Sequence, residues 1–204
     1  MDNISFYQVD AAYIDYLAQY APHLFHNKSA AQQNERKHIG VILMVNGVEY
    51  FAPLSSAKPK HKTMRETLDF IKIKDYAVIN LNNMFPVPPG LASYVDFSKE
   101  KDDKYRSLLL AEYRIIKAFR EKIRKNASIV YNHKLQNGNS TGLSKRCNDF
   151  LLLEEACKQY INRERFDYTE WRQRYFGNMS AEEFNNAAVQ YAREHPFEGR
   201  KADG

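Results

Sequence analysis

The chain has 204 residues, of which 44% are hydrophobic, so it can build the core of one ordinary domain and is not a disordered chain. Its apolar stretches are all shorter than the roughly 18 residues of a membrane-spanning helix, and its two cysteines form no Cys-x-x-Cys pair, which excludes a disulfide scaffold and a zinc ribbon. Lys and Arg number 30 against 25 Asp and Glu, and the net charge of +5 favours a polyanionic partner. We expect a soluble, cytoplasmic protein.

The first half of the chain is predicted to be rich in strands. A short strand is expected over residues 5–9, and Asp10 then stands where the N-cap of a helix over 11–20 would be. The segment 84–90 contains three prolines and is not expected to form a regular element. Further strands are expected over 70–72, 76–81 and 92–97.

A β-hairpin is the strongest local signal. Residues 39–45 are apolar and rich in β-branched side chains, Asn46-Gly47 is the preferred two-residue turn, and an apolar strand returns over 48–54. The nearly unbroken apolar run of the first arm predicts a strand that is buried on both faces. Because such a turn fixes the register, Val45 is expected to face Val48.

The open end of this hairpin gathers basic and hydroxyl side chains. Counting the register outwards, we expect His38 to face Ser55 and Lys37 to face Ser56. Lys and Arg supply positive charge and serine hydroxyls donate hydrogen bonds, so the cluster suits a phosphate group. A solvated hairpin end, where these residues only form the turn, is the alternative. The expected cluster consists of Arg36, Lys37, His38, Ser55, Ser56, Lys58, Lys60 and His61.

The second half of the chain is predicted to be helical. An apolar stripe runs along a helix over 101–126, a flexible loop follows at 137–142, and a second helix is expected over 148–161. Strands followed by helices indicate an α+β fold. We expect one domain over residues 1–162 and a helical C-terminal extension, 163–204, that packs on the same domain.

The absence of several sequence motifs narrows the chemistry. The chain contains no H-E-x-x-H motif, no Walker loop, no G-x-G-x-x-G and no cluster with metal-ligand spacing. A nuclease without a metal works best on RNA, because the 2′-hydroxyl is a built-in nucleophile. Such an enzyme needs a base for that hydroxyl, cations for the charged phosphorane and a proton for the departing 5′-oxygen. The cluster at the hairpin end offers residues of these types.

Four segments resemble the ToxN/AbiQ family, the endoribonuclease toxins of type III toxin–antitoxin systems. They are the hairpin block 37–58, with its I-G-V and A-P-L-S-S-A-K stretches, Phe6-Tyr7 followed by Tyr13, the stretch 77–86, and the stretch 147–155. Their order and spacing agree with the family over about residues 4–162. The resemblance implies a twisted antiparallel β-sheet or partly open barrel, similar to the MazF/CcdB-like toxins and flanked by helices.

The resemblance also implies an activity and a partner. Family members cut RNA at selected, often A-rich sequences without a metal or other cofactor, and leave 2′,3′-cyclic phosphate and 5′-hydroxyl ends. A pseudoknotted repeat antitoxin RNA restrains them in a closed protein–RNA hetero-oligomer, and many act against phage by abortive infection. Neither a metal site nor a membrane partner is expected.

Carried over by motif, the expected catalytic residues are Tyr13, Arg36, Ser55, Ser56 and Lys58. The serines would hold the scissile phosphate, Lys58 would offset its developing charge, and Tyr13 would orient the 2′-hydroxyl or stack on a base, with a buried structural tyrosine as the alternative. Some members have Lys where Arg36 stands, and Arg keeps the cation but does not deprotonate. The expected RNA-binding residues are Lys37, His38, Lys60, His61, Lys117, Arg120, Arg124, Lys145 and Arg146.

Two other functions stay open on the sequence. A non-catalytic RNA-binding protein would present the same basic surface and retain RNA without producing cyclic-phosphate ends. A gyrase-type toxin directed at protein is the other, because related barrels attack gyrase and fold alone does not fix function.

Overall fold

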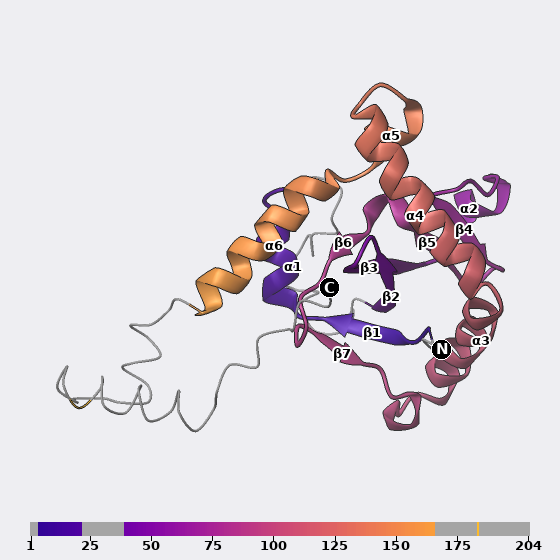
Figure 1. Ribbon diagram of the computed structural model, residues 1–204. Coiled ribbons are helices and arrows are strands. Elements are labelled where there is room, and N and C mark those ends of the chain that lie inside the picture. The colour runs from indigo at the N-terminus through magenta and orange to yellow at the C-terminus, as the bar shows by residue number, and fades with distance from the viewer. Residues whose placement is uncertain (1–3, 22–38, 166–182, 184–204) are drawn as a thin grey trace, which may run out of the picture. The chain divides into compact units, whose positions relative to one another are not determined.

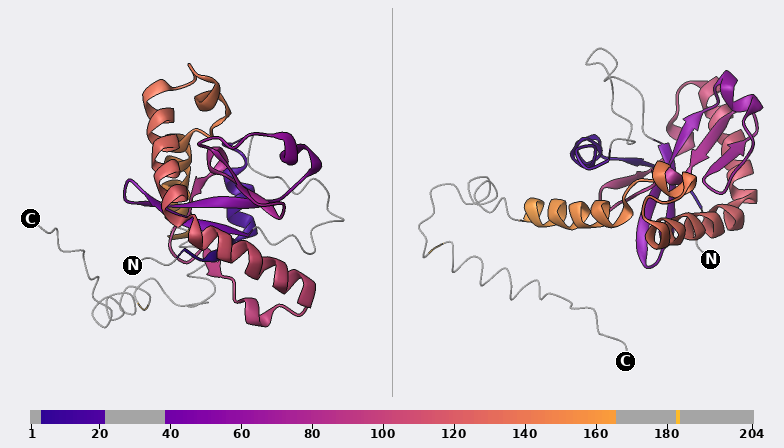
Figure 2. Two further views of the ribbon diagram at one scale, coloured as in Figure 1. Left: turned by 90° about the vertical axis from the view of Figure 1, so that its right-hand side faces the viewer. Right: turned by 90° about the horizontal axis from the view of Figure 1, so that it is seen from above.

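The computed structural model describes residues 4–21, 39–165 and 183 (Figure 1). Residues Met1–Ile161 form one compact unit and Asn162–Gly204 a second. The first unit has a central sheet between two groups of helices (Figures 1 and 2). No helix in the described ranges combines the length and the apolar character that crossing a bilayer requires.

Seven antiparallel strands form the sheet, in the order β4-β5-β3-β2-β1-β7, and β6 pairs with β3 beside this path. β4 and β7 lie at the two ends of that order and do not pair, so the described sheet stays open rather than closing into a barrel. With flanking helices, this confirms the expected α+β class. The strands are β1 (Phe6–Val9), β2 (Ile39–Val45), β3 (Val48–Ser56), β4 (Phe70–Ile73), β5 (Ala77–Asn80), β6 (Phe85–Pro86) and β7 (Ala92–Tyr94).

The β2–β3 hairpin has the register that the turn predicts. Val45 pairs with Val48, and the pairing continues outwards to Gly40 and Pro53. The expectation that the first arm is buried on both faces is wrong, because Met44 is 54% exposed while its neighbours Leu43 and Val45 are buried. β6 was also unexpected. It forms because Phe51 and Tyr50 offer their backbone to a short antiparallel partner despite its proline.

Helices cover the sheet in two groups. The Asp10 carboxylate accepts a hydrogen bond from the Tyr13 backbone N–H at 3.0 Å, which confirms the predicted N-cap. The helix expected over 101–126 is two helices, which meet at Phe119. The helices are α1 (Ala11–Leu17), α2 (Pro59–Thr63), α3 (Asp103–Ala118), α4 (Arg120–Asn137), α5 (Gly142–Arg146) and α6 (Phe150–Arg165), with 3-10 turns at Leu81–Asn83 and Phe97–Lys99.

Alternation along β3 divides the interior into two cores. Tyr50 and Ala52 pack with α3 and α4 on one face, whereas Phe51 packs with α1, α6 and β6 on the other. Gly40 makes room for this second core. A Cβ atom there would lie 2.3 Å from the carbonyl oxygen of Ala52 and 2.6 Å from Cζ of Phe51, so a larger residue cannot fit without moving the strands.

Candidate functional site

The last residues of β3 present two hydroxyl groups on opposite faces of the sheet. Ser55 pairs with Val78 and Ser56 with Ala77 of β5, in an unbroken antiparallel ladder. Successive side chains of a strand point to opposite faces, so Ser56 shares a face with the α3–α4 core and Ser55 lies on the other face. Ser56 is exposed and Ser55 half-buried. Neither hydroxyl forms a hydrogen bond with any residue that the structure describes.

Lys58 follows β3 directly and begins the short helix α2. The ladder extends by one bond beyond β3, from the Ala57 N–H to the Tyr76 carbonyl at 2.9 Å, and Lys58 itself is extended, with φ −109° and ψ 159°. Period-two alternation therefore carries Lys58 to the side of Ser56. Its side chain is exposed. Backbone alternation thus places the side chains of Ser56 and Lys58 on one side of the strand end.

His61 is held by the backbone of Lys58. The Lys58 N–H donates to Nδ1 of His61 at 3.1 Å, so the neutral ring carries its proton on Nε2. Burial lowers the pKa of His61, and the nearby charges of Lys60, Lys58 and Lys72 lower it further. The imidazole is thus a neutral hydrogen-bond donor at physiological pH rather than a cation.

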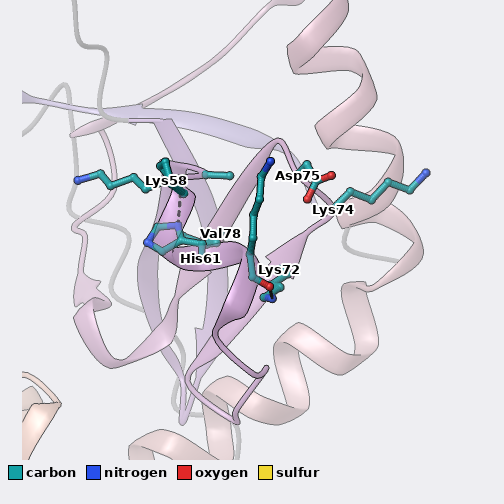
Figure 3. Close-up of a pocket in the computed structure, with 9 residues that line it drawn as sticks. Lys58, His61, Lys72, Lys74, Asp75 and Val78 are labelled. Atoms are coloured by element: carbon teal, nitrogen blue, oxygen red, sulfur yellow. Dashed lines mark hydrogen bonds between the residues drawn. The ribbon is translucent and has the colours of Figure 1, made fainter.

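A pocket of about 350 Å³ lies beside these residues, between α2 and the β4–β5 turn (Figure 3). Lys58 and His61 border one side, and Lys74 and Asp75 border the opposite side, while the Lys58 side chain extends away from Lys74 and Asp75. Its lining consists of Ala57, Lys58, Pro59, His61, Lys62, Lys72, Lys74, Asp75 and Val78.

Sequence reasoning missed the far wall of this pocket. Lys62, Lys72, Lys74 and Asp75 were not among the expected site residues, although a signal for one of them was present. Lys72 pairs with Val78, which pairs with Ser55. Counting the register across a third strand would therefore have placed Lys72 on the face of Ser55.

Tyr13 lies in the second core rather than in this pocket. Its ring is fully buried, 4.9 Å from the ring of Tyr160, and its hydroxyl donates to the Pro86 carbonyl at 2.8 Å. Burial, above all, and the neighbouring Cys157 thiol raise the pKa of Tyr13 far above that of an ordinary phenol. In this arrangement the hydroxyl holds β6 against α1 and does not reach solvent.

The expected RNA-binding residues have different surroundings. Lys37 and His38 lie outside the described residues, as does Arg36, which was expected to be catalytic. Lys60, Lys117 and Lys145 are exposed. Glu121 pairs with Arg120 at 3.2 Å and with Arg124 at 3.7 Å.

Arg146 is bound within the protein. Its Nε and a terminal nitrogen donate to both carboxylate oxygens of the buried Asp69, at 2.6 and 2.7 Å. This fork-to-fork geometry is the one that a phosphate would otherwise use, and it joins α5 to the residue that precedes β4. Within the described ranges, no three His, Cys, Asp or Glu side chains come together as metal ligands would.

Sequence comparisons find relatives of this chain. The family described as "Toxin ToxN, type III toxin-antitoxin system" matches residues 5–158. An endoribonuclease ToxN of Bacillus thuringiensis subsp. kurstaki is 29% identical over 171 residues, or 80% of this chain and 87% of that protein. An endoribonuclease ToxN of Pectobacterium atrosepticum is 29% identical over 165 residues, or 77% and 94%.

Solved structures agree. A type III toxin–antitoxin structure, in which a non-coding RNA pseudoknot selectively inhibits the toxin, superimposes with a TM-score of 0.65 and 28% identity over 79% of this chain and all of the other. AbiQ, a lactococcal anti-phage endoribonuclease, shares the fold with a TM-score of 0.64 at 21% identity, over 79% and 99% of the two chains. Together with the match over residues 5–158, this shows that the chain belongs to the ToxN family of type III toxin–antitoxin toxins.

Proposed function

We propose that this chain is a metal-independent endoribonuclease that cleaves RNA by attack of a 2′-hydroxyl and leaves 2′,3′-cyclic phosphate and 5′-hydroxyl ends. Family membership and the two endoribonuclease relatives support the enzyme class. One observation supports the site. At the end of β3 an exposed hydroxyl, Ser56, lies on the same side as the exposed Lys58, and no described residue hydrogen-bonds to that hydroxyl.

Ser56 and Lys58 are the residues that we assign to the scissile phosphate. The 2′-hydroxyl loses its proton to solvent water as its oxygen attacks phosphorus, and the bond from phosphorus to the 5′-oxygen breaks. Negative charge therefore grows on the non-bridging oxygens and then on the leaving oxygen. The Ser56 hydroxyl donates to a non-bridging oxygen. The Lys58 ammonium offsets the charge and supplies a proton to the 5′-oxygen. Arg36, outside the described residues, is assigned to the phosphate by the family motif.

Ser55 has a different position and therefore a different assignment. Because it lies on the opposite face of the strand from Ser56, both hydroxyls cannot hold one oxygen of one phosphate while the ladder stays regular. RNA that crosses the end of β3 passes both serines in turn. We assign Ser55 to the next linkage, on the side of the lysine-lined pocket.

We extend the proposal to the biological setting. A non-coding RNA pseudoknot inhibits the toxin in one solved relative, and AbiQ acts against phage. By analogy, a pseudoknotted repeat RNA inhibits this chain within a closed protein–RNA assembly. Once released from that RNA, the toxin cleaves cellular or phage RNA in the cytoplasm. The net charge of +5 suits an RNA partner of this kind.

The direct test is cleavage of RNA by the purified chain in EDTA, followed by mapping of the new ends. We expect 5′-hydroxyl and cyclic-phosphate ends at a restricted set of sequences. Ser56→Ala and Lys58→Ala should each lower the rate by roughly 10²–10³-fold, as loss of a transition-state donor does. Both side chains are exposed, so the free energy of unfolding should change by less than about 0.5 kcal/mol.

The matched control is Lys99→Ala, because Lys99 is 83% exposed, lies in the 3-10 turn Phe97–Lys99 and does not line the pocket. Its rate should stay within about twofold of the unmodified chain. Full activity of both Ser56→Ala and Lys58→Ala would refute the site. RNA that is bound but uncut would indicate a binding protein, and DNA damage without RNA cleavage would indicate a toxin directed at gyrase.

A further inference from the structure

The pocket between α2 and the β4–β5 turn adjoins the residues of the chemistry proposed above and has Lys58 in common with them. Ser55, Val78 and Lys72 form a cross-strand row on one face of the sheet. Neighbouring strands lie about 4.8 Å apart, so the backbone of Lys72 is about 10 Å from that of Ser55. A strand of RNA that leaves the Ser56 side of β3 by way of Ser55 therefore enters this pocket.

The positive charge of the pocket lining favours an anion. Four lysines and His61 border it against a single acid, Asp75. The Lys72 ammonium donates one hydrogen bond to the Lys62 carbonyl at 3.1 Å, which fixes its position and leaves two of its three N–H groups for a ligand. His61 adds a neutral donor at Nε2, because its Nδ1 accepts the Lys58 N–H.

Lys74 has a backbone conformation that residues other than Gly and Asn rarely adopt. Its φ is +50°, in the left-handed region where Gly and Asn are the usual residues. The tight turn between β4 and β5 imposes this conformation, since the Tyr76 N–H donates to the Ile73 carbonyl at 3.2 Å. The turn places the Lys74 backbone beside the pocket, and its exposed side chain extends outward from the rim, away from Lys58 and His61 (Figure 3), where it meets RNA that passes out of the pocket.

We propose that this pocket binds one nucleotide of the RNA substrate next to the scissile linkage, with Lys72 on its phosphate, Lys74 on the neighbouring phosphate at the outer rim, and Asp75 on an exocyclic amino group of its base. The proposal rests on the endoribonuclease function above. A pocket of about 350 Å³ is of the size that holds a small ligand. Asp75 repels phosphate, and no described residue pairs with its carboxylate, so the partner that suits it in the complex is a base N–H donor.

The first test measures RNA binding by the full chain in a Ser56→Ala background, which prevents cleavage. The probe is a fluorescein-labelled single-stranded RNA of 20 mixed nucleotides, titrated at several salt concentrations. Lys74→Asn should weaken binding about five- to tenfold and lower the slope of log K against log salt by about 0.7, the value for one phosphate contact on a single strand. Asn tolerates a positive φ, so the fold is retained.

Lys99→Asn is the matched control, because it removes the same charge from an exposed 3-10 turn; its affinity and salt slope should equal those of the background. An unchanged affinity and slope for Lys74→Asn would overturn the phosphate contact. If the unmodified chain fails to cut RNA while Lys74→Asn still weakens binding, the proposed function fails, and with it the place of the pocket beside a scissile linkage, whereas Lys74 remains a contact to RNA. Cleavage by the unmodified chain with no effect of Lys74→Asn overturns the pocket alone.

The second test addresses the base. The unmodified chain and Asp75→Asn each cleave a random RNA pool, and the nucleotides around every cut are counted. Asp75→Asn should flatten the preference for amino-bearing bases at one position beside the cut and leave the other positions as they are, because an amide accepts and donates alike. Identical preferences at every position would remove Asp75 as a specificity residue.

Discussion

The two halves of strand β3 use their hydrogen-bonding groups in opposite ways. In the first half, the Tyr50 hydroxyl donates to Glu154 at 2.6 Å and the Phe51 ring packs against Phe85. In the second half, the hydroxyls of Ser55 and Ser56 bind no residue that the structure describes. Long helices, α4 and α6, cover the first half, whereas only the five-residue α2 follows the second. In the folded protein, polar groups at one end of the strand hydrogen-bond within the protein, and those at the other end can bind a ligand.

The closed half depends on one shared carboxylate. Glu154 of α6 accepts hydrogen bonds from two tyrosines, Tyr50 of β3 and, at 2.9 Å, Tyr131 of α4. Both rings are buried. The carboxylate raises the pKa of Tyr131 to about 12, after burial as the larger cause. Three elements that are distant in sequence are therefore joined at a single oxygen atom.

Removing this carboxylate should give the largest loss of stability. Glu154→Leu leaves two buried hydroxyls without a partner, and we expect the free energy of unfolding to fall by about 3 kcal/mol. Tyr50→Phe removes one bond and no acceptor, so about 1 kcal/mol is expected. Chemical denaturation measures both. The nucleotides selected at the cut should stay the same, because the open half is unaltered.

The matched control for α6 is Glu155→Leu, since Glu155 is 59% exposed and its pair with Lys158 is long, at 3.8 Å. Its effect should stay within about 0.5 kcal/mol. An equal loss in Glu154→Leu and Glu155→Leu would contradict the assignment and would show that the closed half does not depend on the tyrosine–carboxylate network.

The interior also holds one charge that opposes folding. Glu112 of α3 is 5% exposed, and burial raises the pKa of its carboxyl from near 4.5 to about 7. The folded protein therefore keeps this proton between pH 4.5 and 7, where the unfolded chain loses it. Stability from this group is complete below pH 4.5 and is lost as the pH rises through 7. Glu112 also contributes to the raised pKa of Tyr105, after burial.

Replacing Glu112 by Gln should thus stabilise the protein in a pH-dependent way. At pH 8 we expect a gain on the order of 2 kcal/mol, because the buried charge is gone. At pH 4 the gain should vanish, since the Glu112 carboxyl of the unmodified protein is then largely protonated in both the folded and the unfolded state. Thermal or chemical unfolding at the two pH values measures this. A gain that does not depend on pH would show that Glu112 acts through packing instead of charge.

Local rules predicted those parts of the fold that local chemistry determines. The Asn46-Gly47 turn fixes its strand pairing within a few residues, and the observed register from Val45–Val48 to Gly40–Pro53 follows from that turn alone. The Asp10 cap is equally local. The division at Phe119 between α3 and α4 is different. No Gly or Pro stands there, so the break depends on how both helices pack on the sheet.

The burial of Tyr13 is the clearest feature that could not be predicted from the sequence. Helical spacing places Tyr13 on the same side of α1 as Leu17, but it does not say what covers that side. The cover comes from Tyr160 and Cys157 of α6, more than 140 residues along the chain. Only the tertiary packing therefore distinguishes a buried tyrosine from one that meets RNA, and the family motif could not separate the two roles.

Tyr13→Phe decides between these roles, and its expected effect is the smallest. Loss of the hydroxyl leaves the Pro86 carbonyl without its donor, so the free energy of unfolding should fall by about 1 kcal/mol. Cleavage in EDTA should stay within about threefold, because a phenol with so high a pKa and no access to solvent neither takes a proton from RNA nor binds it. A hundredfold loss of cleavage in a folded Tyr13→Phe variant would mean that α1 opens during turnover. The catalytic hydroxyl would then come from the closed part of the molecule, and the contrast between the two halves of β3 would describe only the resting enzyme.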